Sequence, residues 1–318
     1  MNMRYLGIVA TIAVCLAVSA TAGATGVMWG TGSPDWSYTL SGPSPVIFQF
    51  DTSTGVISTT FSFETSNWMW TSGVADNGKY LYASHNIYDI KTDPRSTNTH
   101  DLRIAKIDRD TGAVLSDTSI SGFLGQTYSQ VNALDFHCGR LYAVENATSG
   151  SNIRGYALEI QLDANGDVVG AVRGAYVGPY PDCGLDYHDG LWYATSWTAS
   201  PGGYLGETSN IMTSPDIMNT AFTTLGTASG IGMIDGLEYD SSGNIYAVSW
   251  YGPSATSVYG LNPGTWAATS LYDLQGQLPS KIIQLNGLSE VVPEPLTMAG
   301  LMLGIGSVLT YVRKRRMA

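Results

Sequence analysis

Three acidic residues recur at nearly equal spacing along the chain: Asp135, Asp186 and Glu238 are 51 and 52 residues apart. Each follows a leucine and precedes an aromatic residue. Because side chains alternate along a strand, the acid points away from its two apolar neighbours. Buried carboxyl groups gathered in this way would have raised pKa values and could act as acid and base in glycoside chemistry. The alternative is a structural role, in which the three acids bond to neighbouring repeats or to water in a central channel.

A second polar set lies three positions before the acids. The residue two places before the apolar anchor of each copy is Ser72, Asn132, Cys183, Asp235 or Asn286, and Asp182 adjoins the cysteine. If the strands that carry them surround one axis, their oxygens would converge, and a hard cation such as Ca²⁺ prefers oxygen ligands. The candidate ligands are therefore Asn132, Asp182, Asp235 and Asn286. The alternative is that Asn and Asp simply begin a strand by capping backbone groups.

These residues belong to an internal repeat of about 50 residues. Its anchor positions are Val74, Leu134, Leu185, Leu237 and Leu288, at spacings of 60, 51, 52 and 51 residues. In each of the first four copies the opening strand turns back into a strand with the pattern Leu/Ile/Trp-Tyr-Ala, and a second hairpin follows. Two hairpins per repeat make four strands, which is typical of a β-propeller blade.

The fifth copy is split between the two ends of the chain. The N-terminal part provides only late-blade strands over 27–29, 46–50 and 56–63, and the C-terminal part only an opening strand over 286–292. Joined, they complete one blade. We therefore predict an all-β fold, a five-bladed β-propeller closed by strands from both ends. An open β-sandwich and a propeller with a sixth, degenerate blade are the alternatives.

Composition agrees with an exported β-domain and excludes one class of partner. Charged residues are 13% of the chain, and Gly (37), Tyr (19) and Trp (8) are frequent. Between residues 25 and 292, 25 acidic residues face 10 basic ones, a net charge of about −15. A surface this acidic repels nucleic acid. Exposed aromatic side chains offer a surface that could bind sugars, although they could equally pack between blades: Trp36, Tyr38, Trp68, Trp70, Trp197, Tyr204, Trp250 and Tyr251.

Both ends of the chain predict export. Arg4 precedes an apolar run from Leu6 to Ala20, followed by small residues that fit a signal-peptidase site, so we expect residues 1–24 to be a signal peptide. At the other end, Pro293, Glu294 and Pro295 precede an apolar stretch from Leu296 to Val312. Its length is at the lower limit for a helix that crosses a bilayer. Four basic residues follow, Arg313, Lys314, Arg315 and Arg316. Under the positive-inside rule we expect this basic stop to stay on the cytoplasmic side.

This order of motif, apolar helix and basic end resembles the PEP-CTERM sorting signal of Gram-negative bacteria. The resemblance covers about residues 291–318, and we place the signal at 293–318 and the propeller domain at 25–292. It implies a transient anchor in the inner membrane, recognition by an exosortase-type membrane protease, and delivery to the cell surface or outside it. Proteins of this family are linked with bacteria that produce exopolysaccharide.

The sequence favours a binding protein over an enzyme. It contains no G-x-S-x-G, no H-E-x-x-H and no phosphate-binding glycine loop. We expect a non-enzymatic surface or matrix protein that binds a glycan, a metal or another protein, and the alternative is a carbohydrate-active hydrolase or lyase that uses the channel acids. The propeller register also predicts that Cys138 and Cys183 lie too far apart for a disulfide.

Overall fold

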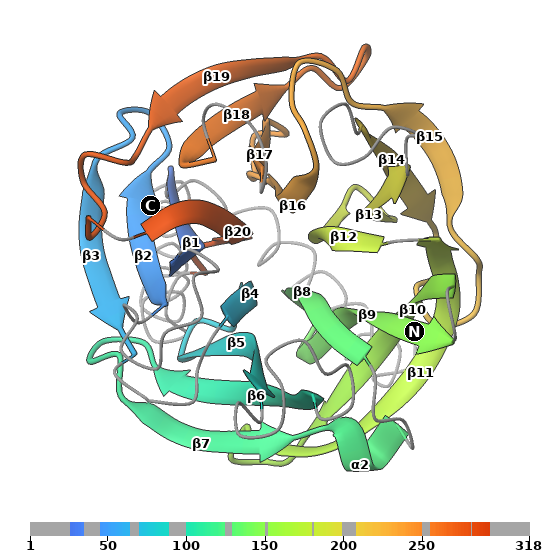
Figure 1. Cartoon of the computed structure of the whole chain (residues 1–318). Coiled ribbons are helices and arrows are strands. Elements are labelled where there is room, and N and C mark those ends of the chain that lie inside the picture. Colours follow the sequence, from blue (N-terminus) through green and yellow to red (C-terminus); the bar gives the residue numbers. More distant parts are fainter. Residues whose placement is uncertain are drawn as a thin grey trace, which may run out of the picture.

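The computed structural model describes residues 26–34, 45–63, 70–88, 100–124, 129–149, 152–179, 181–198, 208–249, 255–280 and 282–292. They form five four-stranded antiparallel sheets arranged in a ring around a central axis (Figure 1). This confirms the five-bladed propeller and excludes the sandwich and the sixth blade. In the described residues no helix is long and apolar enough to cross a membrane.

Each blade begins with its innermost strand and proceeds outward. The closing blade contains β20 (Ile282–Glu290), β1 (Val27–Pro34), β2 (Val46–Asp51) and β3 (Ile57–Ser62). The next two contain β4 (Trp70–Asp76), β5 (Tyr80–Tyr88), β6 (His100–Asp108) and β7 (Val114–Ser119), then β8 (Ser129–His137), β9 (Arg140–Ser149), β10 (Asn152–Leu162) and β11 (Val168–Pro179). The last two contain β12 (Pro181–His188), β13 (Leu191–Thr198), β14 (Thr208–Ser214) and β15 (Thr223–Thr227), then β16 (Ile234–Tyr239), β17 (Ile245–Ser249), β18 (Ser257–Leu261) and β19 (Ala268–Asp273).

The ring is closed as the split repeat predicts. The C-terminal strand β20 pairs with the N-terminal strand β1 and is the innermost strand of their sheet. The outer hairpin of the β12 blade, between β14 and β15, has no glycine in its turn. Asp216 holds that turn instead, since its carboxylate accepts the backbone N–H groups of Met218 and Asn219.

The two ends of the propeller differ. At one end, which we call the turn face, lie the tight turns between first and second strands and between third and fourth strands. Cys138 and Asp189 occupy matching turns there with φ of 49° and 48°, which confirms the repeat alignment. The opposite end, the loop face, holds the starts of the first strands and the short helix α2 (Ser121–Leu124).

The hydrophobic core lies mainly in the wedges between neighbouring blades. One cluster joins Met28, Phe48 and Phe50 of the closing blade to Tyr246 and Val248 of the blade before it. Aromatic rings bridge the wedges near the turn face: Tyr82 stacks on Phe136, His137 contacts Tyr187 and His188 stacks on Tyr239. The repeated histidines are thus packing residues.

Small residues line the axis one position before each apolar anchor. They are Gly73, Ala133, Gly184, Gly236 and Gly287. A Cβ added at Gly73 would lie 2.7 Å from the backbone nitrogen of Leu134, and one at Gly236 would lie 3.0 Å from that of Leu288. The repeated small residue therefore lets the five inner strands approach one another closely.

We expect Gly287→Ala to lower the free energy of unfolding by about 1–3 kcal/mol, the usual cost of overpacking. The new Cβ would lie 2.5 Å from the carbonyl oxygen of Ser72, a backbone atom that cannot rotate away. Urea unfolding followed by tryptophan fluorescence measures the change. The matched control is Gly122→Ala, where the added Cβ meets open space. Equal stability of the two variants would contradict a tightly packed axis.

Candidate functional site

The three repeated acids lie at one level around the axis, and each bonds to the next blade. The Asp186 carboxylate accepts the backbone N–H of Tyr239 at 3.0 Å, and Glu238 accepts that of Glu290 at 2.8 Å. Asp135 accepts the backbone N–H of Tyr187. Ser289 takes the same part in the closing blade, since its hydroxyl accepts the N–H of Asp76. We name these four side chains the inter-blade belt.

Burial gives the acids of the belt unusual proton affinities. Asp186 and Glu238 are each only 5% exposed. Burial raises the pKa of Asp135 to about 7. Burial, followed by repulsion from the neighbouring acids, raises the pKa values of Asp186 and Glu238 well above the usual range. Burial thus raises the three pKa values in the direction predicted from sequence, while the backbone N–H group that each acid accepts from the next blade acts to lower them.

The second polar set lies on the loop-face side of the belt, at a β-bulge in each first strand. The ladder of β8 is interrupted at Asn132, that of β16 at Asp235 and that of β20 at Asn286. The side chains of all three are buried. A bulge residue is left out of the ladder, which explains why polar residues recur there. The side chains of Asp182 and Cys183 lie outside the described residues.

The amide of Asn286 is held by neighbouring side chains. It donates to the hydroxyl of Ser33 at 2.7 Å and accepts from the amide of Gln284 at 3.3 Å. Among the residues that the structure describes, no group of three or more His, Cys, Asp or Glu side chains could hold a metal ion. The set is thus mainly amides and hydroxyls, and the Ca²⁺ hypothesis stays a prediction.

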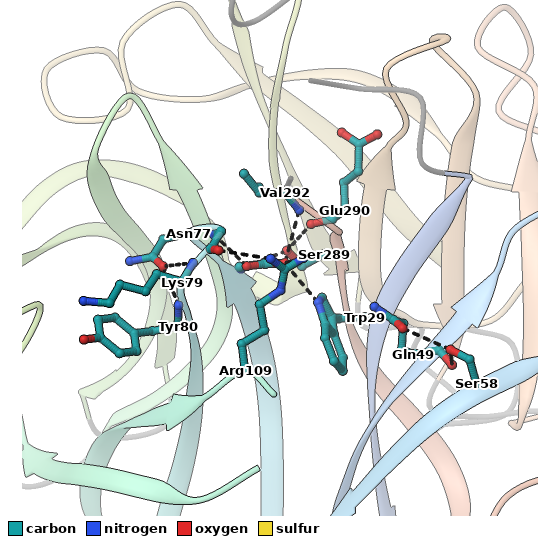
Figure 2. A network of polar contacts seen from close by, with 12 residues as sticks. Trp29, Gln49, Ser58, Asn77, Lys79, Tyr80, Arg109, Ser289, Glu290 and Val292 are labelled. Atoms are coloured by element: carbon teal, nitrogen blue, oxygen red, sulfur yellow. Dashed lines mark hydrogen bonds and ion pairs between the residues drawn. The ribbon is translucent and has the colours of Figure 1, made fainter. Parts of the chain in front are cut away.

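A third constellation, not predicted from sequence, surrounds Asp76 at the turn face. Its buried carboxylate accepts from Trp29 Nε1 at 3.0 Å, from the N–H of Gly78 at 2.7 Å and from the N–H of Val292 at 3.1 Å. Arg109 lies 3.1 Å away as an ion partner. Trp29, Arg109 and Val292 converge on one point (Figure 2). We call this group the Asp76 latch, because it joins the blade of β4 to the N-terminal and C-terminal strands of the propeller domain.

The sequence did contain a signal for the latch. In the first copy of the repeat the acid is displaced by one position, so that Ala75 stands where the other copies have Asp135 or Asp186, and Asp76 stands where they have an aromatic residue. The displaced acid faces the opposite side of the strand. Burial raises its pKa, although Arg109 and the hydrogen bonds oppose this.

Several predicted residues cannot be placed. Pro293, Glu294 and Pro295 and the basic stop from Arg313 to Arg316 lie outside the described residues. Of the eight aromatic residues proposed as a sugar-binding surface, the structure describes only the half-buried side chain of Trp197. Cys138 is an exposed free thiol, as the register predicts.

Known proteins resemble this chain only distantly. No family model and no curated protein matches the chain. Among solved structures, the nidogen/laminin complex is 13% identical with a TM-score of 0.46, over 85% of this chain and 100% of that one. An α-L-arabinofuranosidase from Clostridium thermocellum is 12% identical with a TM-score of 0.46, over 78% and 92%. The periplasmic gluconolactonase of Pseudomonas aeruginosa is 13% identical with a TM-score of 0.40, over 77% and 67%.

Proposed function

We propose that the chain is an exported, surface-sorted propeller that binds an extracellular glycan without transforming it. The observation that carries this proposal is the inter-blade belt. The repeated acids Asp135, Asp186 and Glu238 accept backbone N–H groups of the neighbouring blades and so help to hold the ring together. A hydrolase would need such carboxylates free to reach a substrate.

The loop face is the proposed binding surface. The polar side chains at the first-strand bulges, among them Asn132 and Asn286, are buried beneath this face, so they support the proposed surface and the sugar would meet the groups outside them. Trp197 lies near the end of β13 on this side, and its half-buried ring offers an apolar surface for stacking against a sugar. Ligand sites combine aromatic side chains with a few polar groups in this way. Ca²⁺ is a proposed accessory ligand at Asn132, Asp235 and Asn286.

Residues 25–292 should bind selected glycans on an array of bacterial polysaccharides, and Ca²⁺ should strengthen the binding. The bound polysaccharide should keep its chain length, which size-exclusion chromatography with light scattering measures after long incubation. A fall in chain length that Asp186→Asn abolishes would support the alternative, a hydrolase or lyase. Asp189→Asn, at an exposed side chain on the turn face, is the control.

The sorting part of the proposal has its own test. If Pro293, Glu294 and Pro295 form an exosortase recognition motif, Glu294→Ala should leave full-length protein in the inner membrane of the native host, while the wild-type chain is cut and exported. Immunoblots of membrane and extracellular fractions measure this. Equal release of both chains would leave the C-terminal stretch as an ordinary anchor.

A further inference from the structure

The two ends of the propeller domain leave it side by side at the turn face. The N–H of Val291 donates to the carbonyl oxygen of Val27 at 3.2 Å, and the N–H of Val292 donates to Asp76. Val27 follows the predicted signal peptide, and Val292 directly precedes the sorting motif. Both segments predicted to enter a membrane are therefore attached at the same face.

The tether between the domain and the predicted membrane helix is short. Leu296 follows Val292 by four residues, which span at most about 14 Å even when fully extended. Val292 follows β20, the innermost strand of its blade, and the Asp76 latch fixes its backbone. Three further strands at about 4.8 Å spacing separate this point from the rim, so a tether of this length cannot clear the rim and reach the loop face.

We propose that the turn face lies against the lipid bilayer while the tail is uncut, and that the loop face points away from it. This inference rests on the membrane tail of the proposed function. This orientation places the sorting motif beside the Asp76 latch at the bilayer surface, where a membrane protease would reach the motif. The glycan-binding face is then directed toward the surroundings before the chain is released.

The charge of the turn face explains release. Its turns carry exposed or half-buried carboxylates at Asp51, Asp108, Asp110, Asp163, Asp189 and Asp240, against which stand the basic side chains of Lys79, Arg109 and Arg140. An acidic surface is repelled by anionic lipids. The tail alone therefore holds this face at the membrane, and its removal frees the domain.

Energy transfer from a dye on the protein to acceptor-labelled lipid tests the orientation. The native Cys138 reports from the turn face, with Cys183→Ser so that one thiol remains. Gly122→Cys in α2, in a Cys138→Ser and Cys183→Ser background, reports from the loop face, where the added side chain meets open space. The two sites differ in height by about 25 Å, the length of an eight-residue strand. The chain should lack the signal peptide, keep residues 293–318 and be reconstituted into phosphatidylcholine vesicles.

Transfer from Cys138 should exceed transfer from the Gly122→Cys site several-fold. Asp189→Cys, in a turn with the same backbone conformation as Cys138, should match the Cys138 signal and guards against a folding defect at one site. Equal or reversed transfer, in a chain that floats with the vesicles, would overturn the orientation alone. A chain that does not float with the vesicles would overturn both the orientation and the proposed membrane tail.

Discussion

Asp76→Ala should lower the free energy of unfolding of residues 25–292 by roughly 3–5 kcal/mol, the usual cost of removing one partner of a buried ion pair. Arg109 is only 12% exposed at its side chain and would lose its counter-ion. Trp29 Nε1 and the N–H of Val292 would lose their acceptor as well. An unpaired buried donor carries its full desolvation cost, so the losses add to that of the charge.

Urea unfolding of Asp76→Ala beside the wild-type domain measures this loss. Asp110→Ala removes an exposed carboxylate from the same face and should change stability by less than about 0.5 kcal/mol. Hydrogen exchange gives a second readout, because the amides of β20 and β1 should exchange faster once the latch is gone. Similar stability of the two variants would show that the network around Asp76 contributes little to ring closure.

The second large effect concerns pH. The raised pKa values mean that the folded domain keeps protons on Asp135, Asp186 and Glu238 that the unfolded chain releases. Between the ordinary carboxyl pKa and these raised values, the folded state therefore binds more protons, and stability falls as pH rises. Each unit by which a pKa is raised is worth about 1.4 kcal/mol. We expect the domain to be more stable near pH 5 than at pH 8.

The double variant Asp186→Asn with Glu238→Gln should remove most of this dependence. The amides keep an oxygen that accepts the N–H groups of Tyr239 and Glu290, but they cannot ionise. Thermal unfolding from pH 5 to pH 8 should give a flatter profile, with a higher melting temperature than the wild type at pH 8. Asp189→Asn should keep the wild-type slope. A double variant with an unchanged slope would show that both acids are already ionised in the folded domain across this range.

Below about pH 4 the stability depends instead on carboxyl groups whose pKa values are lowered in the folded state. Hydrogen bonds from hydroxyl and backbone groups in the hairpin turns hold the pKa values of Asp51 and Asp108 below their usual range. These residues contribute stability only while they are ionised, so their contribution is lost as pH falls. Both are open to solvent, and the effect of each is small compared with that of the buried acids.

The amino-acid sequence by itself determined the architecture. Five anchor positions about 50 residues apart, the first four followed by hairpins, specified five blades, and the split fifth copy specified how the ring closes. These features depend on local alternation and turn chemistry, which a repeat displays several times over. The same alternation placed Asp135, Asp186 and Glu238 on the side of the strand opposite to Leu and the aromatic residue.

Only the tertiary structure decided what those residues contact. Asp186 and Glu238 accept hydrogen bonds from backbone amides about 50 residues away, and Asp76 accepts one from Val292, 216 positions away in sequence. The small residues before each anchor are required because the inner strands approach one another closely at the axis. The physical reason is that hydrogen-bond partners and backbone approach are set by the closure of the ring, which brings together strands that no local pattern relates.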